Sequence, residues 1–478
     1  MPKQSLSHER SIFDQQGVDR IYSEIREVYR QDHRPWVVGF SGGKDSTTAL
    51  QLVWYALRGL PESERSKPVF VISSDTLVET PAIVDYLNQT LERINETAKS
   101  SRMPFQAHKV RPLASDTFWV NLVGRGYPAP YQSFRWCTDR LKIQPADRFI
   151  LQKVSEHGEV ILVLGVRSAE SMTRAQVMSL HRIPHSPLSK HSKFTHTFVY
   201  APIRDWSTED VWTYLLQVPS PWGSNNHDLL AMYQTASGEC PLVVDTTTPT
   251  CGNSRFGCWT CTLVERDRTM EGMIDQGETW MQPLLDFHDF LVETQDPDKK
   301  HVYRDYKRRS GKVSFKTDGS GKIARGPYKL DFCKELLKRL LEVEAYVRGH
   351  GPDPNLCLIS LEELHEIRGI WRKERGDWQD SVPKIYNQVT GQTMEFAPDD
   401  LGSFRGEDLE VLQRICEREG LPTRLVSKLL DVEFQLQGMT RRSSIFNRLD
   451  AVLSEEWRTE EEIIAAAERV REKGGATD

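Results

Sequence analysis

The chain has 478 residues, of which 38% are hydrophobic and 27% are charged, and its mean hydropathy is −0.52. This length predicts two or three domains. The sequence contains no run of 18 or more apolar residues, so we expect no membrane span. The net charge of −6 excludes a uniformly basic nucleic-acid-binding chain, and the N-terminus lacks a secretory signal pattern, so we expect a cytoplasmic protein. Eight cysteines in this length indicate metal or catalytic use rather than a disulfide framework.

A strand, a glycine-rich turn and a helix are predicted to follow one another near the N-terminus. Residues 36–40 form an apolar run typical of a buried strand, and residues 48–57 are typical of a helix. The turn between them reads Ser41, Gly42, Gly43, Lys44, Asp45, Ser46, Thr47. Such a turn directs backbone N–H groups and a helix N-terminus at an anion, so these seven residues are candidates for binding phosphate. The alternative is a tight connection without a ligand, and the turn does not match the Walker pattern.

Two later strands are predicted to end beside this turn. Residues 69–75 end in Asp75, and residues 160–166 are followed by Arg167. Strands that alternate with helices predict an α/β fold with a doubly wound, mostly parallel sheet, whose ligands bind beyond the carboxyl ends of the strands. We therefore expect one rim to carry Lys44, Asp45 and Arg167 as catalytic candidates. Asp45 or Asp75 is expected to hold Mg²⁺ or the ribose, and Arg167 to clamp a phosphate.

The cysteines divide into two groups. Four of them lie within 22 residues, namely Cys240, Cys251, Cys258 and Cys261. Four thiolates suit zinc and an iron–sulfur cluster equally well, and their spacing alone does not choose between the two.

Cys137 stands apart from that group, close to Arg135, Arg140 and Lys142, and these cations are expected to lower its pKa. A free thiolate there is predicted to carry sulfur as a persulfide. The alternatives are a buried packing residue or a further cluster ligand. The three other cysteines are predicted to be packing residues, namely Cys333, Cys357 and Cys416.

A basic segment follows the cysteines. Residues 299–329 contain eleven Lys or Arg and two acids, with four interleaved Tyr or Phe residues and several glycines. This pattern predicts a loop or hairpin that contacts the DNA backbone, with rings available for an unstacked base. The candidate DNA-binding residues are Lys307, Arg308, Arg309 and Lys312. The alternative is a solvated loop, which charge runs usually form.

The last third of the chain is predicted to be helical, because leucines recur at helical spacing after residue 330. We interpret it as a scaffold for docking other proteins, with packing as the equal alternative. The predicted domains are residues 1–235, the cysteine and basic segment at 236–330, and the helical region at 331–478.

Several motifs resemble those of a known family. The turn at residues 41–46 resembles that of the PP-loop ATP pyrophosphatases, which split ATP into AMP and pyrophosphate. Residues 164–171 and 202–212 are similar to segments of the phosphoadenylyl-sulfate reductase branch. Residues 73–81, 134–140 and 251–261 are similar to motifs of the DndC family, the PP-loop proteins of bacterial DNA phosphorothioation. The resemblance covers roughly residues 10–330.

This resemblance implies a PP-loop domain of the adenine nucleotide alpha hydrolase-like type with an iron–sulfur insert. It implies an enzyme that uses ATP to adenylate a DNA backbone phosphate, releasing pyrophosphate, so that sulfur replaces a non-bridging oxygen. The implied cofactors are ATP, Mg²⁺ and a [4Fe–4S] cluster on the four clustered cysteines. The implied partners are DNA, DndD- and DndE-like proteins and a cysteine desulfurase as sulfur donor, with no membrane.

Three other interpretations stay open. A sulfonucleotide reductase needs a catalytic cysteine near the C-terminus, whereas the last cysteine here is Cys416. A tRNA thiolase also uses a PP-loop and a cluster, but residues 202–212 fit it less well. From a different class, the chain could be a non-catalytic subunit that senses nucleotide and DNA. ATP turnover would separate that interpretation from the enzymes.

Overall fold

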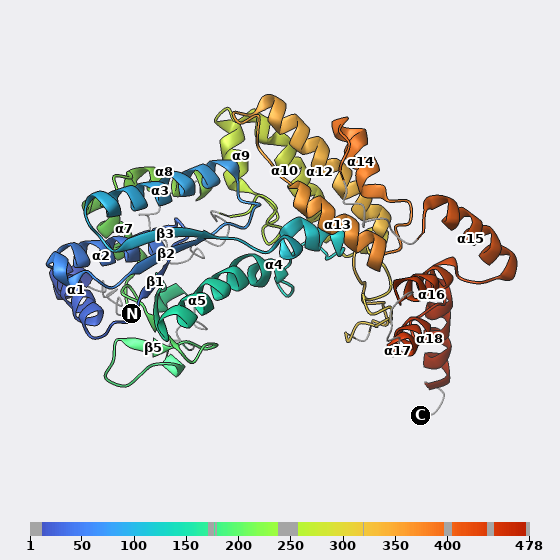
Figure 1. Cartoon of the computed structure of the whole chain (residues 1–478), viewed down its shortest axis with the longest axis horizontal. Helices are drawn as coiled ribbons and strands as arrows, with labels where there is room; N and C mark the ends of the chain where they lie inside the picture. The colour runs from blue at the N-terminus through green and yellow to red at the C-terminus, as the bar shows by residue number, and fades with distance from the viewer. Residues whose placement is uncertain are drawn as a thin grey trace, which may run out of the picture. The chain divides into compact units, whose positions relative to one another are not determined.

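The computed structural model describes residues 12–170, 176, 179–237, 257–318, 320–395, 404–436 and 444–474 (Figure 1). The chain divides into two compact units. Unit 1 comprises Met1–Leu113 and Arg135–Thr279, and unit 2 comprises Ala114–Phe134 and Trp280–Asp478. A short piece of the N-terminal half therefore folds with the C-terminal part. The domain boundaries near residues 235 and 330 stay predictions.

Unit 1 is built on a six-stranded sheet of order β3-β2-β1-β4-β6-β5. The strands are β1 (Trp36–Gly39), β2 (Val69–Ser74), β3 (Phe105–Val110), β4 (Val160–Val163), β5 (Leu188–Lys190) and β6 (Thr197–Tyr200). All adjacent pairs are parallel except β5 with β6. The predicted α/β fold with a mostly parallel sheet is confirmed. The direction of winding reverses between β1 and β4, where open sheets of this type bind ligands.

Helices cover both faces of this sheet (Figure 1). Alternate side chains of a strand point to opposite faces, so Trp36 and Val38 lie in one core and Val37 lies in the other. The first core is covered by α1 (Ile12–Arg30), α2 (Lys44–Arg58), α3 (Pro81–Ser100) and α7 (Thr208–Gln217), and the second by α5 (Gln144–His157). Unit 1 also contains α4 (Trp136–Thr138), α8 (Asn226–Ser237) and α9 (Arg268–Asp275). Burial on both faces explains why the central strands are uninterrupted apolar runs.

Unit 2 is helical, as predicted for the C-terminal region. Its helices are α10 (Gln282–Glu293), α11 (Lys300–Tyr303), α12 (Leu330–His350), α13 (Leu361–Glu374), α14 (Ser381–Thr390), α15 (Gly406–Glu419), α16 (Thr423–Leu436), α17 (Ile445–Leu453) and α18 (Glu460–Gly474). The segment from residues 114–134 is anchored there by two buried indoles. Trp119 donates to the Leu358 carbonyl at 2.6 Å, and Trp371 donates to the Val123 carbonyl at 3.0 Å.

The basic segment forms a hairpin in unit 2. Phe315 and Ile323 pair as an antiparallel bridge, the Ala324 N–H donates to the Ser314 carbonyl at 2.7 Å, and the Lys316 N–H donates to the Lys322 carbonyl at 2.9 Å. These contacts confirm the predicted loop or hairpin. Among the helices of the described ranges, none is long and apolar enough to cross a membrane.

Candidate functional site

The turn after β1 closes onto the N-terminus of α2. Gly42 has a φ of +73°, a conformation that glycine adopts without steric cost. The Ser41 N–H donates to the Ser46 hydroxyl at 3.2 Å, and that hydroxyl donates to the Gly43 carbonyl at 3.0 Å. The first N–H groups of a helix have no partner within it, and the helix dipole favours negative charge there. This end of α2 therefore has the geometry of an anion-binding site.

Three charged side chains meet at this turn. The Asp45 carboxylate accepts from Lys44 Nζ at 2.8 Å with one oxygen and from Arg167 Nε at 2.7 Å with the other. The side chains of Lys44 and Arg167 are only 9% and 5% exposed. Arg167 also donates to the Thr208 hydroxyl at 3.1 Å. Two cations share this carboxylate beside the helix N-terminus, where a polyphosphate would be stabilised.

Gly165 allows the strand exit after β4 to approach the turn closely. A Cβ added at Gly165 would lie 2.4 Å from the Asp45 carbonyl oxygen and 2.8 Å from the Ser46 nitrogen. Both neighbours are backbone atoms, so relief requires the turn itself to move. Glycine at this position therefore lets Arg167 reach Asp45.

We expect Gly165→Ala to weaken ATP binding by about tenfold or more, because overpacking costs about 1–3 kcal/mol and here displaces the phosphate-binding turn. Isothermal titration with ATP measures the effect. Gly369→Ala is the matched control, because Gly369 lies within α13 and a Cβ there would meet nothing within 4 Å. Equal ATP affinity in Gly165→Ala and the control would contradict the expectation.

Asp75 and Thr47 are two further candidates for contact with the ligand. Asp75 follows β2, and its carboxylate accepts from Arg111 Nε at 2.9 Å and from the Leu77 N–H at 3.1 Å. The Thr47 hydroxyl is buried and has no hydrogen-bond partner among the described residues. The contact of Thr47 with a phosphate stays a prediction.

Sequence reasoning missed Tyr233. Its hydroxyl accepts from the Lys44 N–H at 3.3 Å, and Lys44 Nζ lies 5.6 Å from the centre of its ring. Tyr233 lies on α8, and its ring packs edge-on against that of Trp212 at 5.2 Å. No motif links it to a turn 189 residues earlier. Only the tertiary packing reveals this contact.

A second group of side chains gathers around Cys258. Cys258 pairs with Glu79 as an antiparallel bridge, and the Trp259 N–H donates to the Val78 carbonyl at 3.0 Å. The Cys258 thiol lies 3.3 Å from the Thr76 hydroxyl. The Cys258–Cys261 turn is thereby docked on the loop that follows β2, the same loop that begins with Asp75.

Cys137 joins this group. It interacts electrostatically with Cys261, and Lys142 interacts electrostatically with both of them. The Cys258 thiol, followed by Glu79, Cys261 and Cys137, raises the pKa of Lys142. We refer to Glu79, Cys137, Lys142, Cys258 and Cys261 as the thiol group.

The expected lowering of the Cys137 pKa is wrong. Burial raises the pKa of this thiol, and the neighbouring Cys261 raises it further, which together outweigh the hydrogen bond from Thr138 and the charge of Lys142. Burial also raises the pKa of Cys258 to about 12. The basic residues near Cys137 predicted the nearby positive charge, but they did not predict the burial of the thiol, which raises its pKa.

Only part of the predicted metal site can be located. Cys240 and Cys251 lie outside the described residues, and within the described ranges no group of three or more His, Cys, Asp or Glu side chains is arranged to hold a metal. The three thiols of the thiol group are nevertheless soft donors, and the positive charge of Lys142 would balance the negative charge of thiolate ligands. Their chemistry therefore fits a thiolate-bound centre, either iron–sulfur or zinc.

The four candidate DNA-binding residues differ in exposure. Arg308, Arg309 and Lys312 are exposed. Lys307 is only 9% exposed, and its Nζ lies 4.5 Å from the centre of the Trp457 ring. Burial lowers the pKa of Lys307. A phosphate would reach the three exposed residues first.

Residues 35–264 match the model of the phosphoadenosine phosphosulfate reductase domain. An uncharacterized protein of Methanocaldococcus jannaschii is 26% identical over 241 residues, which are 50% of this chain and 39% of that protein. The match therefore spans less than half of the length of that relative.

Three solved structures are similar with a TM-score of 0.28 each. Phosphoadenylyl-sulfate reductase from Candida auris, in a phosphate complex, is 14% identical, and the match covers 46% of this chain and 92% of that one. FMN adenylyltransferase from Candida glabrata, with FAD and inorganic pyrophosphate, is 14% identical, with coverages of 52% and 70%. The U34-tRNA thiolase NcsA from Methanococcus maripaludis, with its [4Fe-4S] cluster, is 11% identical, with coverages of 59% and 82%.

Proposed function

Because residues 35–264 carry a phosphoadenosine phosphosulfate reductase-like PP-loop domain, we propose that the chain is a DndC-like enzyme of DNA phosphorothioation. It uses ATP to adenylate a DNA backbone phosphate so that sulfur replaces a non-bridging oxygen. One observation carries the proposal. The loop after β2 begins with Asp75 at the carboxyl end of the sheet and reaches the thiol group with Thr76 and Glu79. Nucleotide and sulfur chemistry are thereby combined in one unit.

The reaction has two displacements at phosphorus. A non-bridging oxygen of DNA attacks the α-phosphorus of ATP, the bond between the α-phosphorus and the bridging oxygen breaks, and pyrophosphate leaves. A sulfur nucleophile then attacks the DNA phosphorus, and AMP leaves with the former DNA oxygen. A persulfide donor additionally needs a thiol that supplies two electrons, because its sulfur–sulfur bond must break.

The turn at α2 supplies the electrostatic part of the first displacement. Its backbone N–H groups and Lys44 would bind the β- and γ-phosphates, and Arg167 would balance the charge of the leaving pyrophosphate. Asp45 orients both cations through its two short contacts. The carboxylates of Asp45 and Asp75 are of the type that binds Mg²⁺, which neutralises phosphate charge when bound.

The thiol group supports the sulfur chemistry. Cys258 and Cys261, together with Cys240 and Cys251, would hold a [4Fe–4S] cluster, which supplies electron transfer or sulfur handling when bound. The Cys258 thiol raises the pKa of Lys142, which favours a positive charge beside these sulfurs, whereas burial raises the pKa of Glu79. The position of Cys137 beside Cys261 supports two roles, a further ligand or a sulfur carrier at the same centre.

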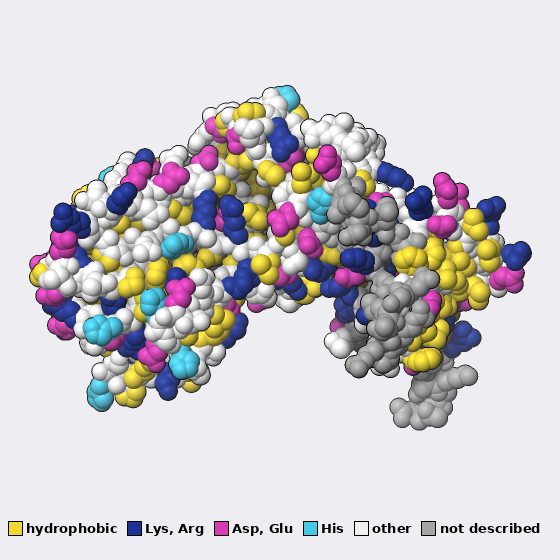
Figure 2. Space-filling view, viewed as in Figure 1, with side chains coloured by type: hydrophobic (Ala, Val, Ile, Leu, Met, Phe, Trp, Pro, Cys, Tyr) yellow, Lys and Arg dark blue, Asp and Glu magenta, His cyan; other side chains and the backbone are white. Residues whose placement is uncertain are grey.

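Exposed apolar side chains support the proposed docking of DndD- and DndE-like proteins. Val411, Ile415, Phe446 and Leu453 of helices α15 and α17 are 46–74% exposed. Figure 2 shows hydrophobic side chains gathered over this part of unit 2. Such a patch is typical of a protein interface.

The test combines the anaerobically purified chain with a cysteine desulfurase and its substrate L-cysteine, a thiol reductant, ATP, Mg²⁺ and DNA. Mass spectrometry of the digested DNA is expected to show phosphorothioate-linked dinucleotides, which disappear in Lys44→Ala. Sulfite formed from phosphoadenylyl sulfate would instead indicate a reductase, and thiolated tRNA would indicate a thiolase. Nucleotide bound without turnover would indicate a sensing subunit.

A further inference from the structure

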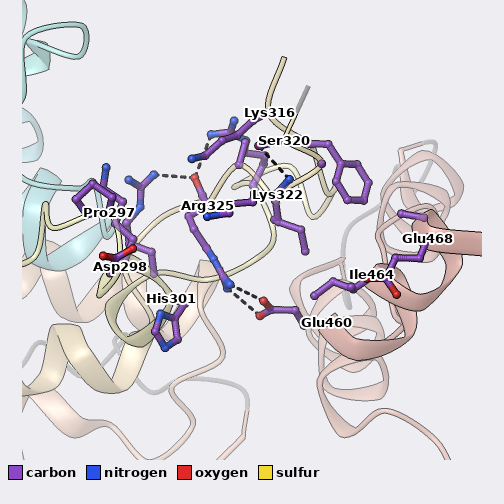
Figure 3. Close-up of a pocket in the computed structure, with 18 of the residues that line it drawn as sticks. Pro297, Asp298, His301, Lys316, Ser320, Lys322, Arg325, Glu460, Ile464 and Glu468 are labelled. Carbon is purple, nitrogen blue, oxygen red and sulfur yellow. Dashed lines mark hydrogen bonds and ion pairs between the residues drawn. The ribbon is translucent and has the colours of Figure 1, made fainter. Parts of the chain in front are cut away.

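A basic cavity opens in unit 2 between the hairpin and helix α18 (Figure 3). Its volume is about 600 Å³, and six Lys or Arg but only three acids line it. Figure 3 shows Lys316 and Lys322 on the hairpin side and Glu460 and Glu468 on the side of α18. The wall therefore carries an excess of positive charge.

Part of this charge is already paired. Arg325 spans the cavity and donates to both oxygens of Glu460, at 2.8 Å and 2.5 Å. Arg304 is used internally, because it donates to the carbonyl oxygens of Gly326 at 2.8 Å and Arg325 at 2.7 Å. These contacts hold the base of the hairpin in place.

The other four cations of the cavity wall differ from Arg325, whose charge is neutralised by an ion pair with Glu460. In the part of the chain that the structure describes, no ion pair joins Lys300, Arg308, Lys316 or Lys322 to an acid. Burial, with Arg304 and Lys316 nearby, lowers the pKa of Lys300. The cations thus repel one another, and an anionic ligand would relieve this repulsion.

A second basic cavity adjoins the first. It has a volume of about 130 Å³, is lined by seven Lys or Arg and three acids, and shares Arg308 with the larger cavity. Two adjoining basic cavities fit the successive phosphates of a polymer better than a single small anion. The polymer that the proposed function requires is DNA, so this inference rests on it.

The wall of the larger cavity also offers aromatic surface. Phe315 and Tyr131 both line it, and Phe315 is 39% exposed. A cavity of this volume has the size of a nucleotide site, and exposed rings beside cations stack unpaired bases without regard to sequence. These features favour an unpaired strand over a duplex.

We propose that the two cavities bind an unpaired segment of a DNA strand. Lys316, Lys322 and Arg308 bind its phosphates, and Phe315 stacks against a base. Glu460 competes with phosphate for Arg325, so a strand must displace this carboxylate to reach the guanidinium. The DNA is thus held in the single-stranded form on unit 2.

The test measures fluorescence anisotropy of labelled single-stranded DNA over a series of salt concentrations. The variant Lys316→Gln/Lys322→Gln is expected to lower the slope of log Kd against log salt by about 1.4, since each phosphate contact on a single strand contributes about 0.7. The control Lys99→Gln/Lys190→Gln, which removes two exposed charges of unit 1, keeps the slope. Glu460→Gln is expected to tighten binding, because it frees Arg325.

An unchanged slope in Lys316→Gln/Lys322→Gln, with its circular dichroism spectrum intact, would overturn the proposal. Tighter binding of duplex DNA or of an RNA of the same sequence would overturn it as well. Phosphorothioate formation is measured in parallel. If the original chain forms phosphorothioate but the double variant keeps the slope, the two cavities do not bind the strand and the proposed function stands. If the double variant lowers the slope but the original chain forms no phosphorothioate, the cavities bind the strand and the proposed function is refuted.

Discussion

Asp45→Asn is expected to lower the rate of ATP-dependent pyrophosphate release by about 10²–10³-fold, the cost of removing one electrostatic group from an active site. The Asp45 carboxylate holds Lys44 at 2.8 Å and Arg167 at 2.7 Å. Without its charge, two largely buried cations repel each other and lose their orientation toward the phosphates. A coupled pyrophosphate assay at saturating ATP would show the loss in kcat.

Asp85→Asn is the matched control, because Asp85 is exposed on α3 and the same chemical change there leaves the turn intact. Melting temperatures would verify that both variants are folded. A kcat for Asp45→Asn within a factor of two of the control would remove Asp45 from the proposed site.

The second large effect is expected for the thiol group. We expect Cys258→Ser and Cys261→Ser to lose most of the iron and acid-labile sulfide of the anaerobically purified chain, since a cluster needs its thiolate ligands. Cys137→Ser is expected to keep its iron, because the four clustered cysteines already supply one thiolate to each iron. Iron, zinc and sulfide analysis with a visible spectrum measures all three.

Cys357→Ser is the control for these variants, because Cys357 is exposed and belongs to unit 2. Iron retained in both Cys258→Ser and Cys261→Ser would contradict a cluster at this turn. Stoichiometric zinc without sulfide would make the centre structural. If Cys137→Ser alone among the three variants keeps its iron but no longer transfers sulfur to DNA, Cys137 is the residue that carries the sulfur.

The sheet and its rim could be predicted from the sequence because their signals are local. Apolar runs followed by a glycine turn or a charged residue predicted β1 and β4 and placed Asp45 and Arg167 at the carboxyl ends of these strands. The two strands pair directly, so the two side chains meet. The rule for parallel sheets was sufficient to predict this contact.

Contacts that depend on distant segments could not be predicted. Tyr233 reaches the phosphate turn through the packing of α8, and Lys142, which was expected near Cys137, also interacts with the distant Cys258 and Cys261. Charge patterning likewise suggested an exposed Lys307, whereas Trp457, 150 residues later in the sequence, packs over it. Burial of a charged group is decided by such distant partners.

We propose that unit 1 cleaves ATP between its α- and β-phosphates with DNA as the acceptor. Chromatography of the nucleotide products, with and without DNA, tests this proposal. With the sulfur donor present, we predict AMP and pyrophosphate in equal amounts, formed faster with DNA and lost in Lys44→Ala. Formation of ADP and phosphate, or turnover that DNA does not change, would contradict the claim.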